Sequence, residues 1–308
     1  MNVDGPVETV FARGTRICGD TDGRRIDVIV GELKRFKIEV TGLQETHWFG
    51  QATYSIGDSI VLLSGRSLPL DGAPLLHGKG VAIVLRGSAL RAWKDGGSQW
   101  RPISLRLAMA PLRMVSAANT SWTEKTYVCI HVVVWYAPMF HSPRDTKDVF
   151  FNNLQCVLRD VPRGDKFILL GDFNARVGSR SNPVDVWSAV RDPRGLGVCN
   201  NAGSQLMTFL NLNNATVCNT WFDKQPVYKG SWHHPSTKQW HSIDFVIVHQ
   251  RDRKFCQDCR VVRAAGWGSD HRMVCSTFLF QELRFSRRVK TSKRLRYNVG
   301  LLKSVPGR

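Results

Sequence analysis

The sequence lacks any hydrophobic run that approaches the about 18 residues of a membrane-spanning helix. Residues 1–14 carry acids and have no apolar core of the kind that a secretory signal needs. The chain also has no internal repeat and no low-complexity linker. These absences argue against a helical membrane span, a secretory leader and a repeat architecture, and we expect one intracellular domain with flanking segments.

Acidic residues are scarce, because 25 Asp and Glu stand against 43 Lys and Arg and the formal net charge is +18. Such a balance implies a polyanionic partner, first nucleic acid and second an acidic membrane surface. A solvated basic surface is the plain alternative. Residues 281–308 hold nine Lys and Arg against one acid, Glu282. This basic tail suits phosphate binding or nuclear import. The alternative is a solvated terminus without such a role. For the location of the protein, we favour the nucleus over the cytoplasm.

Regular cysteine spacing is missing as well. The eight cysteines follow no disulfide framework, so we expect reduced thiols. One close pair, Cys256-x-x-Cys259, precedes His271 and Cys275 and resembles a zinc knuckle. The pattern has only one close pair, and His271 fits a different role described below, so we do not adopt the zinc interpretation.

Hydrophobic residues make up 43% and charged residues 22% of the chain, which are ordinary values for a globular protein with a substantial core. Apolar spacing predicts helices over 24–37, 145–159 and 203–210. β-rich runs predict strands over 38–43, 80–85, 127–135, 167–170 and 215–219, and another after residue 244. The region between residues 85 and 127 looks loop-like, with strand-like patches over 103–114, and 232–240 resembles a polar aromatic loop. This alternation indicates an α/β architecture with packed sheets.

An acid and an amide follow the apolar run 167–170, in the string Gly171-Asp172-Phe173-Asn174. Two residues apart at the end of a strand, Asp172 and Asn174 point to the same side of the chain. A lone Asp in such a place is usually a turn former. Carboxylates recur in this way, however, together with one His, which suggests a metal-assisted phosphoesterase. The other strings are Leu43-Gln44-Glu45-Thr46, Ile243-Asp244-Phe245 and Ser269-Asp270-His271.

Taken in order with Trp135-Tyr136-Ala137-Pro138, these strings resemble the endonuclease/exonuclease/phosphatase superfamily of deoxyribonuclease-I-like enzymes. Residues 27–48 and 232–248 look most similar to LINE-type retrotransposon endonuclease domains and craniofacial development protein 2-like proteins. The resemblance covers residues 15–280, which leaves 1–14 as an atypical amino-terminal segment and 281–308 as the basic tail. It implies a four-layer α/β/β/α sandwich of two packed mixed β-sheets flanked by helices.

The resemblance also implies roles for individual residues. Glu45 would be the main ligand of Mg²⁺, or of Mn²⁺ in its place, and Asp270 would serve the metal directly or through water. Asp172 would orient and deprotonate the attacking water, and Asn174 would hold the scissile phosphate. These roles supply the base and the Lewis acid that phosphodiester hydrolysis requires.

Two further roles concern the charge that develops on the phosphate. His271, oriented and kept cationic by Asp244, would donate to a phosphate oxygen, and Tyr136 would hydrogen-bond the same group. Aromatic and basic side chains that could contact nucleic acid are Trp232, His233, His234 and Trp240, for which ordinary packing is the competing explanation, and Arg287 and Arg288 in the tail.

The chain departs from the family at one place. The family's first strand ends in an Asn that helps to hold the metal, but here that slot falls at residues 13–17, and no Asn lies between Asn2 and Asn119. A cationic Arg13 there would repel Mg²⁺. We predict a Mg²⁺-dependent phosphodiesterase, a monomeric DNA-nicking endonuclease of retrotransposon origin. The alternatives are a catalytically impaired DNA- or chromatin-binding descendant, and a phosphatase acting on inositol phosphate or lipid headgroups.

Overall fold

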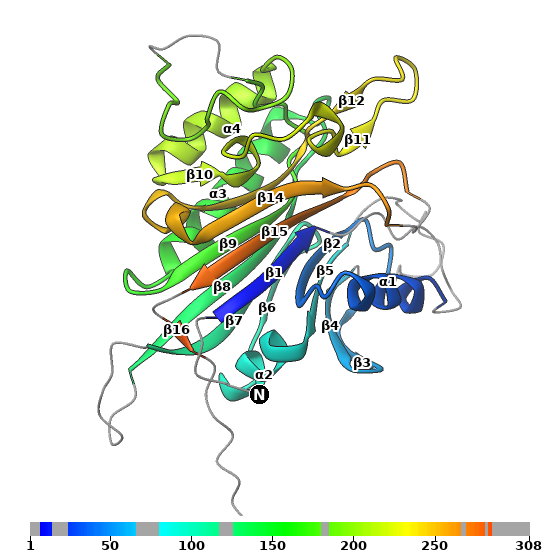
Figure 1. The fold of residues 1–308 in the computed structure, drawn as a ribbon, viewed down its shortest axis with the longest axis vertical. Coiled ribbons are helices and arrows are strands. Elements are labelled where there is room, and N and C mark those ends of the chain that lie inside the picture. The colour runs from blue at the N-terminus through cyan, green and yellow to red at the C-terminus, as the bar shows by residue number, and fades with distance from the viewer. Residues whose placement is uncertain are drawn as a thin grey trace, which may run out of the picture.

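The computed structural model describes residues 7–13, 24–65, 80–116, 126–179, 185–265, 269–280 and 283–284. Within these ranges two seven-stranded sheets pack face to face, with helices on their outer faces (Figure 1). Each sheet is mixed, since each contains one parallel strand pair among antiparallel ones. The four-layer α/β/β/α sandwich predicted from the sequence is therefore confirmed.

The first sheet has the strand order β14-β15-β1-β2-β5-β4-β3. β1 runs parallel to β2 and antiparallel to β15, so it joins strands from distant parts of the sequence (Figure 1). The strands are β1 (Val7–Arg13), β2 (Val40–Gln44), β3 (Gln51–Ile56), β4 (Ser59–Ser64), β5 (Val81–Arg86), β14 (Cys256–Val262) and β15 (Met273–Phe280).

The second sheet has the order β10-β13-β9-β8-β7-β16, with β6 paired to β7. β8 and β9 are parallel and are connected through a helix, as parallel neighbours require. The strands are β6 (Arg101–Ser104), β7 (Leu107–Ser116), β8 (Tyr127–Tyr136), β9 (Lys166–Asp172), β10 (Ala215–Val217), β13 (Asp244–His249) and β16 (Leu283–Arg284).

Three apolar clusters hold the layers together. Helix α1 (Arg24–Arg35) places Ile29 and Leu33 against the outer face of the first sheet. Helices α3 (Arg144–Asp160) and α4 (Asn201–Leu212) cover the outer face of the second sheet. The third cluster lies between the sheets. There, a Cβ on Gly42 of β2 would come within 2.8 Å of Val134 of β8, so the glycine allows the sheets to approach closely.

Most of the predicted elements are present. The prediction of a loop-like region after residue 85 is wrong over helix α2 (Gly87–Asp95), a short helix between flanking glycines that packs Ala89 and Trp93 into the core between the sheets. The predicted loop 232–240 contains a hairpin of β11 (Trp232–His233) and β12 (Trp240–His241). Short 3₁₀ helices complete the fold: η1 (Cys218–Thr220), η2 (Pro226–Tyr228) and η3 (Gln250–Phe255).

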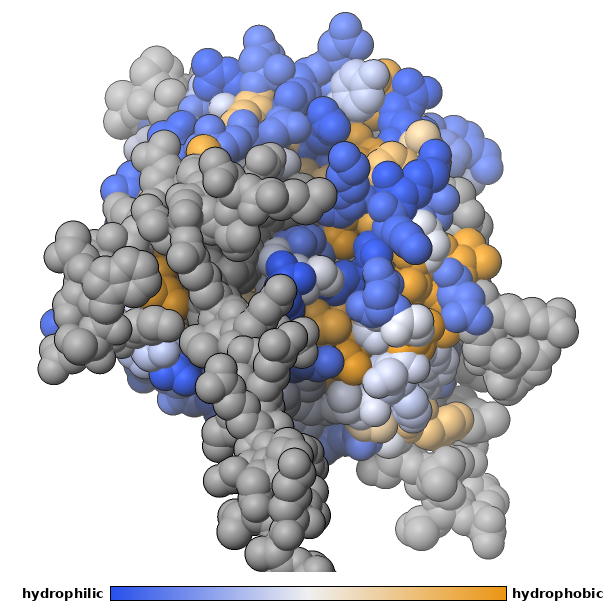
Figure 2. Space-filling view, turned by 60° about the horizontal axis from the view of Figure 1, so that its bottom comes forward, coloured by the Kyte–Doolittle hydropathy of each residue, from blue (hydrophilic) through white to orange (hydrophobic). Residues whose placement is uncertain are grey.

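The predicted domain boundaries at residues 15 and 280 stay predictions. Two strands beyond them, β1 and β16, nevertheless pair with strands of the sandwich. The rest of both flanking segments, including Arg287 and Arg288, lies outside the described residues. On the face in Figure 2, hydrophilic residues lie over much of the described surface, with smaller hydrophobic areas between them. None of the helices in the described ranges is long and apolar enough to cross a membrane.

Candidate active site

Three strands of the second sheet bring polar side chains into one row. In the strand register, Asp172 at the end of β9 stands opposite Tyr136 of β8 on one side and Asp244 of β13 on the other. Residues that stand opposite each other across a ladder point to the same face of the sheet. The apolar runs that form these strands therefore deliver three polar groups to one point.

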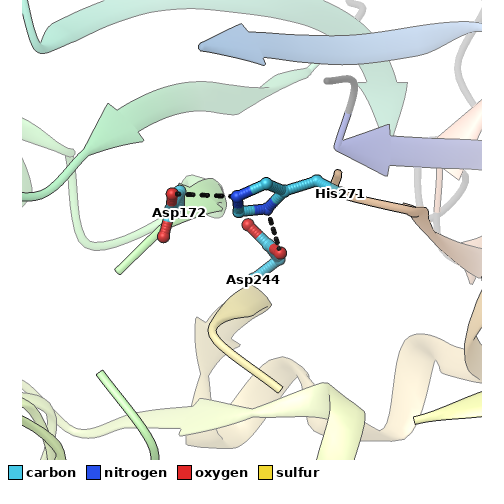
Figure 3. A group of neighbouring side chains, drawn as sticks. All are labelled: Asp172, Asp244 and His271. Atoms are coloured by element: carbon cyan, nitrogen blue, oxygen red, sulfur yellow. Dashed lines mark hydrogen bonds and ion pairs between the residues drawn. The ribbon is translucent and has the colours of Figure 1, made fainter. Parts of the chain in front are cut away.

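The first sheet adds a histidine to this row. Nδ1 of His271, just before β15, lies 2.9 Å from Oδ2 of Asp244, and its Nε2 lies 4.0 Å from Oδ2 of Asp172 (Figure 3). Asp172 and Asp244 are buried, at 3% and 0% exposure. Because an ionised carboxylate only accepts hydrogen bonds, Nδ1 of His271 is the donor, and Nε2 faces Asp172.

A second contact between the sheets joins Tyr136 to Glu45, the residue after β2. The Tyr136 hydroxyl donates to Oε1 of Glu45. Burial, and then the Glu45 carboxylate, raise the pKa of Tyr136 well above its usual value, so the hydroxyl keeps its proton. Glu45 has a φ of 51°, a left-handed conformation that is uncommon for a residue with a Cβ. Such backbone strain is typical of functional positions.

Arg106, between β6 and β7, was not predicted from the sequence. Its guanidinium lies over the Tyr136 ring, with 4.9 Å from Cζ to the ring centroid, and donates to the backbone carbonyls of Tyr136 and Ala137 at 3.2 and 3.1 Å. Burial lowers the pKa of Arg106, while the nearby Tyr136 and Glu45 oppose that shift. It places a cation close enough to Glu45 and Asp172 to interact with their charges. No motif in the sequence marks it.

The turn after β9 fixes the side chains of Asp172 and Asn174. The Asn174 backbone N–H donates to Oδ1 of Asp172 at 2.9 Å, and its side-chain amide donates to the Ala137 carbonyl at 2.9 Å. Asn174 has a φ of 46°, a conformation that Asn tolerates better than most residues. The string recognised in the sequence is thus a tight polar turn that holds the Asp172 carboxylate in place.

Ser231, another residue without a sequence signal, ties the hairpin to the site. Its buried hydroxyl accepts from the backbone N–H groups of Ile243 and Asp244 at 3.2 and 3.3 Å. Its carbonyl accepts from the Arg272 N–H at 2.7 Å. Ser231 therefore connects the two segments that carry Asp244 and His271.

These elements surround a cleft of about 610 Å³. The expected site residues Glu45, Tyr136, Asp172, Asn174, Asp270 and His271 line it, and Asp244 lies behind His271. Met139 and Phe140 line it as well, with 57% and 54% of their surfaces exposed.

The residues expected to contact nucleic acid separate into two groups. Trp232 and His234 line the cleft, and the indole N–H of Trp232 donates to Oδ2 of Asp270 at 3.1 Å. His233 and Trp240 are not part of the cleft lining; their rings pack together with centroids 4.9 Å apart. Arg272 lies over Trp240 at 3.4 Å from Cζ to the ring centroid. For His233 and Trp240, packing accounts for the contacts that the structure shows.

A metal ion has suitable ligands in this cleft. Among the described residues, Asp172, Asp244 and His271 offer ligand atoms within 4.8 Å of one another. Glu45, Asp172 and Asp270 add carboxylate oxygens to the cleft wall, and such hard oxygen donors suit a divalent cation. Arg13, the first residue of the segment 13–17 where the sequence resemblance expects an Asn, pairs through its backbone with Gly42 in β2, three residues before Glu45.

No family model matches the chain. Among curated proteins, craniofacial development protein 2 from Bos taurus is 28% identical over 255 residues, and the protein of the same name from Tragulus javanicus is also 28% identical. Each match covers 82% of this chain and 38% and 40% of the relative, respectively. The chain thus spans about two fifths of the length of the curated relatives it matches.

Solved structures of nucleases and a phosphatase share the fold. The catalytic domain of Xenopus laevis APE2 superposes with a TM-score of 0.58 at 15% identity, covering 91% of this chain and 94% of that one. The endonuclease domain of TRAS1, a telomere-specific non-LTR retrotransposon, gives 0.54 at 14% identity, covering 88% and 98%. A 3′ phosphatase from Neisseria bound to a product DNA hairpin gives 0.56 at 16% identity, covering 88% and 99%. The chain has the fold of the endonuclease/exonuclease/phosphatase superfamily, as its motifs predicted.

Proposed function

We propose that the chain is a divalent-metal-dependent phosphodiesterase that nicks DNA. The observation that carries the proposal is the position of His271, between Asp172 and Asp244 and in the same cleft as the Glu45–Tyr136 pair. A base, a proton donor and a carboxylate that can hold a metal are the groups that phosphodiester hydrolysis needs.

Asp172 is the group that orients and deprotonates the attacking water. Its Oδ1 accepts the Asn174 N–H, and its Oδ2 lies on the side of Nε2 of His271, where the water would bind. Nδ1 of His271 donates to Asp244, which favours the doubly protonated ring, and in that cationic form Nε2 donates to a non-bridging phosphate oxygen. The Tyr136 hydroxyl, which stays protonated because its pKa is raised, donates its one proton to Glu45 in this structure and would turn it to the phosphate once Glu45 binds the metal. Together these donors stabilise the negative charge that develops in the transition state.

We assign the metal to Glu45, with Asp270 as a further oxygen in the cleft. Asp172, Asp244 and His271 are not assigned as the ligands, because in this proposal Asp244 accepts from Nδ1 of His271 and Nε2 serves the phosphate. When bound, Mg²⁺ supplies a Lewis acid for the phosphate and the leaving oxygen. Mn²⁺ suits the same oxygen donors.

DNA is the substrate class that best suits the charge. The net charge of +18 favours a polyanion, and the solved neighbours include one bound to a DNA product. The likeness to a retrotransposon endonuclease domain supports descent from such an element. The chain would act as a monomer, and a DNA substrate fits the nucleus.

The test is nicking of supercoiled plasmid with and without Mg²⁺. The expected result is conversion to open circles by the parent protein and its loss in Glu45→Ala and His271→Ala. Asp145→Ala removes an exposed acid from α3 and serves as the matched control, which should nick normally. If the parent protein shifts plasmid on a gel but never nicks it, the chain is a DNA-binding protein. If it instead releases phosphate from inositol phosphates and leaves plasmid intact, it is a phosphatase.

A further inference from the structure

We propose that Arg176, His234 and His241 form a second phosphate-binding subsite, which holds a phosphate within a few nucleotides of the scissile one on the same DNA strand. The inference rests on the proposed function, since it takes DNA as the substrate. All three side chains line the cleft that contains the candidate catalytic residues, and none of the three was assigned to catalysis or to the metal.

Arg176 is held rigidly through its backbone. Its N–H donates to Oδ1 of Asn200 at 3.0 Å, and the Asn200 N–H donates back to the Arg176 carbonyl at 3.1 Å. The same Oδ1 caps α4 by accepting from the Gly203 N–H at 2.8 Å. A Cβ on Gly203 would collide with the Arg176 carbonyl, so the helix packs directly on this residue. The guanidinium therefore starts from a fixed point on the cleft wall.

The Arg176 guanidinium also keeps its charge available. Within the part of the chain that the structure describes, the ion pairs of neighbouring arginines use Asp185 and Asp192, and none involves Arg176. An arginine in a cleft without a carboxylate partner is suited to bind a phosphate through two parallel N–H groups.

His234 provides an N–H donor with a fixed orientation in the same cleft. Its Nδ1 accepts from the backbone N–H groups of Ser236 and Thr237 at 3.2 and 3.1 Å. A neutral imidazole has one donor and one acceptor nitrogen, so the proton lies on Nε2. The ring therefore donates to an anion even when it is neutral.

His241 completes the cluster from the opposite strand of the hairpin. Its ring centroid lies 6.1 Å from that of His234. Burial is the main cause that lowers the pKa of His241, and repulsion by Arg176, and by His234 when it is protonated, lowers it further. A bound phosphate would relieve that repulsion.

The position of the cluster relates it to the scissile phosphate. The Trp232 ring lies between the two groups, with its centroid 6.2 Å from that of His271 and 5.2 and 6.1 Å from those of His234 and His241. The cluster is thus connected to His271, the proposed phosphate donor, through the ring of Trp232. Since a strand advances about 3.4 Å per nucleotide along the helix axis, a phosphate within a few nucleotides of the cleavage position reaches it.

The experiment measures binding in EDTA, so that it requires no turnover. A duplex oligonucleotide is synthesised as a series in which one phosphate at a time is replaced by a neutral methylphosphonate, and affinity is measured by fluorescence anisotropy. For the parent protein we expect one position near the cleavage site, besides the scissile one, at which the replacement weakens binding by about tenfold. Arg176→Ala and His234→Ala should weaken binding to the unmodified duplex and lose the sensitivity at that one position.

The controls separate this subsite from general charge effects. Arg91→Ala removes an exposed cation from α2 and should keep the full pattern, and Arg176→Lys should regain part of the sensitivity. Arg176→Ala should also reduce the slope of log affinity against log salt by about one. If Arg176→Ala keeps the same sensitivity at every position, the subsite is refuted. The anisotropy assay tests the subsite, and the plasmid assay tests nicking. A failure of the proposed function can therefore be distinguished from a failure of the subsite.

Discussion

Asp172 and Asp244 stand directly opposite each other in the register of β9 and β13, and the imidazole of His271 lies between their carboxylates. Like charges in opposed positions of a ladder destabilise a sheet, and burial strengthens their repulsion. His271 relieves that repulsion while it presents Nε2 to the cleft. The histidine thus has a structural effect that accompanies its chemical one.

Removal of this histidine should cost stability as well as activity. His271→Ala leaves two buried carboxylates facing each other, and we expect the free energy of unfolding to fall by about 3 kcal/mol. The loss should shrink below about pH 4, where carboxylates take up protons. Urea unfolding at pH 7 and at about pH 3 checks this. Equal losses at both pH values would contradict the electrostatic explanation.

The Tyr136 hydroxyl should act as a donor at every working pH. Tyr136→Phe removes the hydrogen bond to Glu45 and the proposed donor to the phosphate, so we expect kcat for nicking to fall by about 100-fold. Because the raised pKa of Tyr136 keeps it protonated, the alkaline limb of the pH–rate profile should be the same in both proteins. A limb that disappears in the Phe variant would show that Tyr136 titrates within the working range.

Ser231 is a positioning residue, and its removal should affect turnover rather than binding. Ser231→Ala leaves the buried N–H groups of Ile243 and Asp244 without their acceptor, which costs about 1–3 kcal/mol. We expect kcat to fall by about tenfold with KM unchanged, because Asp244 and His271 lose their alignment. Ser231→Thr, which restores a hydroxyl, should recover most of the rate. A change confined to KM would place Ser231 in substrate binding instead.

Buried thiols should make the protein less stable at alkaline pH. Burial raises the pKa of Cys259 well above its usual value and that of Cys275 to about 12. A thiol whose pKa is raised by folding stabilises the fold below its unfolded pKa of about 8.5, and this contribution is lost as the pH rises towards the folded value. Each such thiol lowers the free energy of unfolding by up to about 1.4 kcal/mol per pH unit in that window.

The measurement is urea unfolding between pH 7 and pH 11. Cys259→Ala should reduce the slope of stability against pH above pH 9, whereas Cys156→Ala, which removes an exposed thiol from α3, should leave it unchanged. The same slope in all three proteins would mean that other groups govern alkaline unfolding.

The features that could be predicted well are those that leave a pattern in a few consecutive residues of the sequence. The strand that ends at Asp172 is a continuous apolar run because both of its faces are covered, and its polar end is visible without a structure. Arg106 and Ser231 could not be found in this way, since their importance depends on which strands become neighbours. Helix α2 was missed because it has only nine residues, begins at Gly87, is followed by Gly96, and packs Ala89 and Trp93 into the core between the sheets.

Strand β1 determines when this fold can be completed. Val7 pairs with Phe280 and Arg13 with Val274, while the same strand pairs with β2 on its other side. During synthesis, β1 is made early but can pair with β15 only after that late strand has been made. The first sheet becomes continuous only then. Glu45 lies beyond one neighbour of β1 and His271 lies before the other. The two halves of the cleft thus acquire their spacing only at the end of folding, so a nascent chain that already contains Glu45, Asp172 and Asp244 still lacks the assembled site.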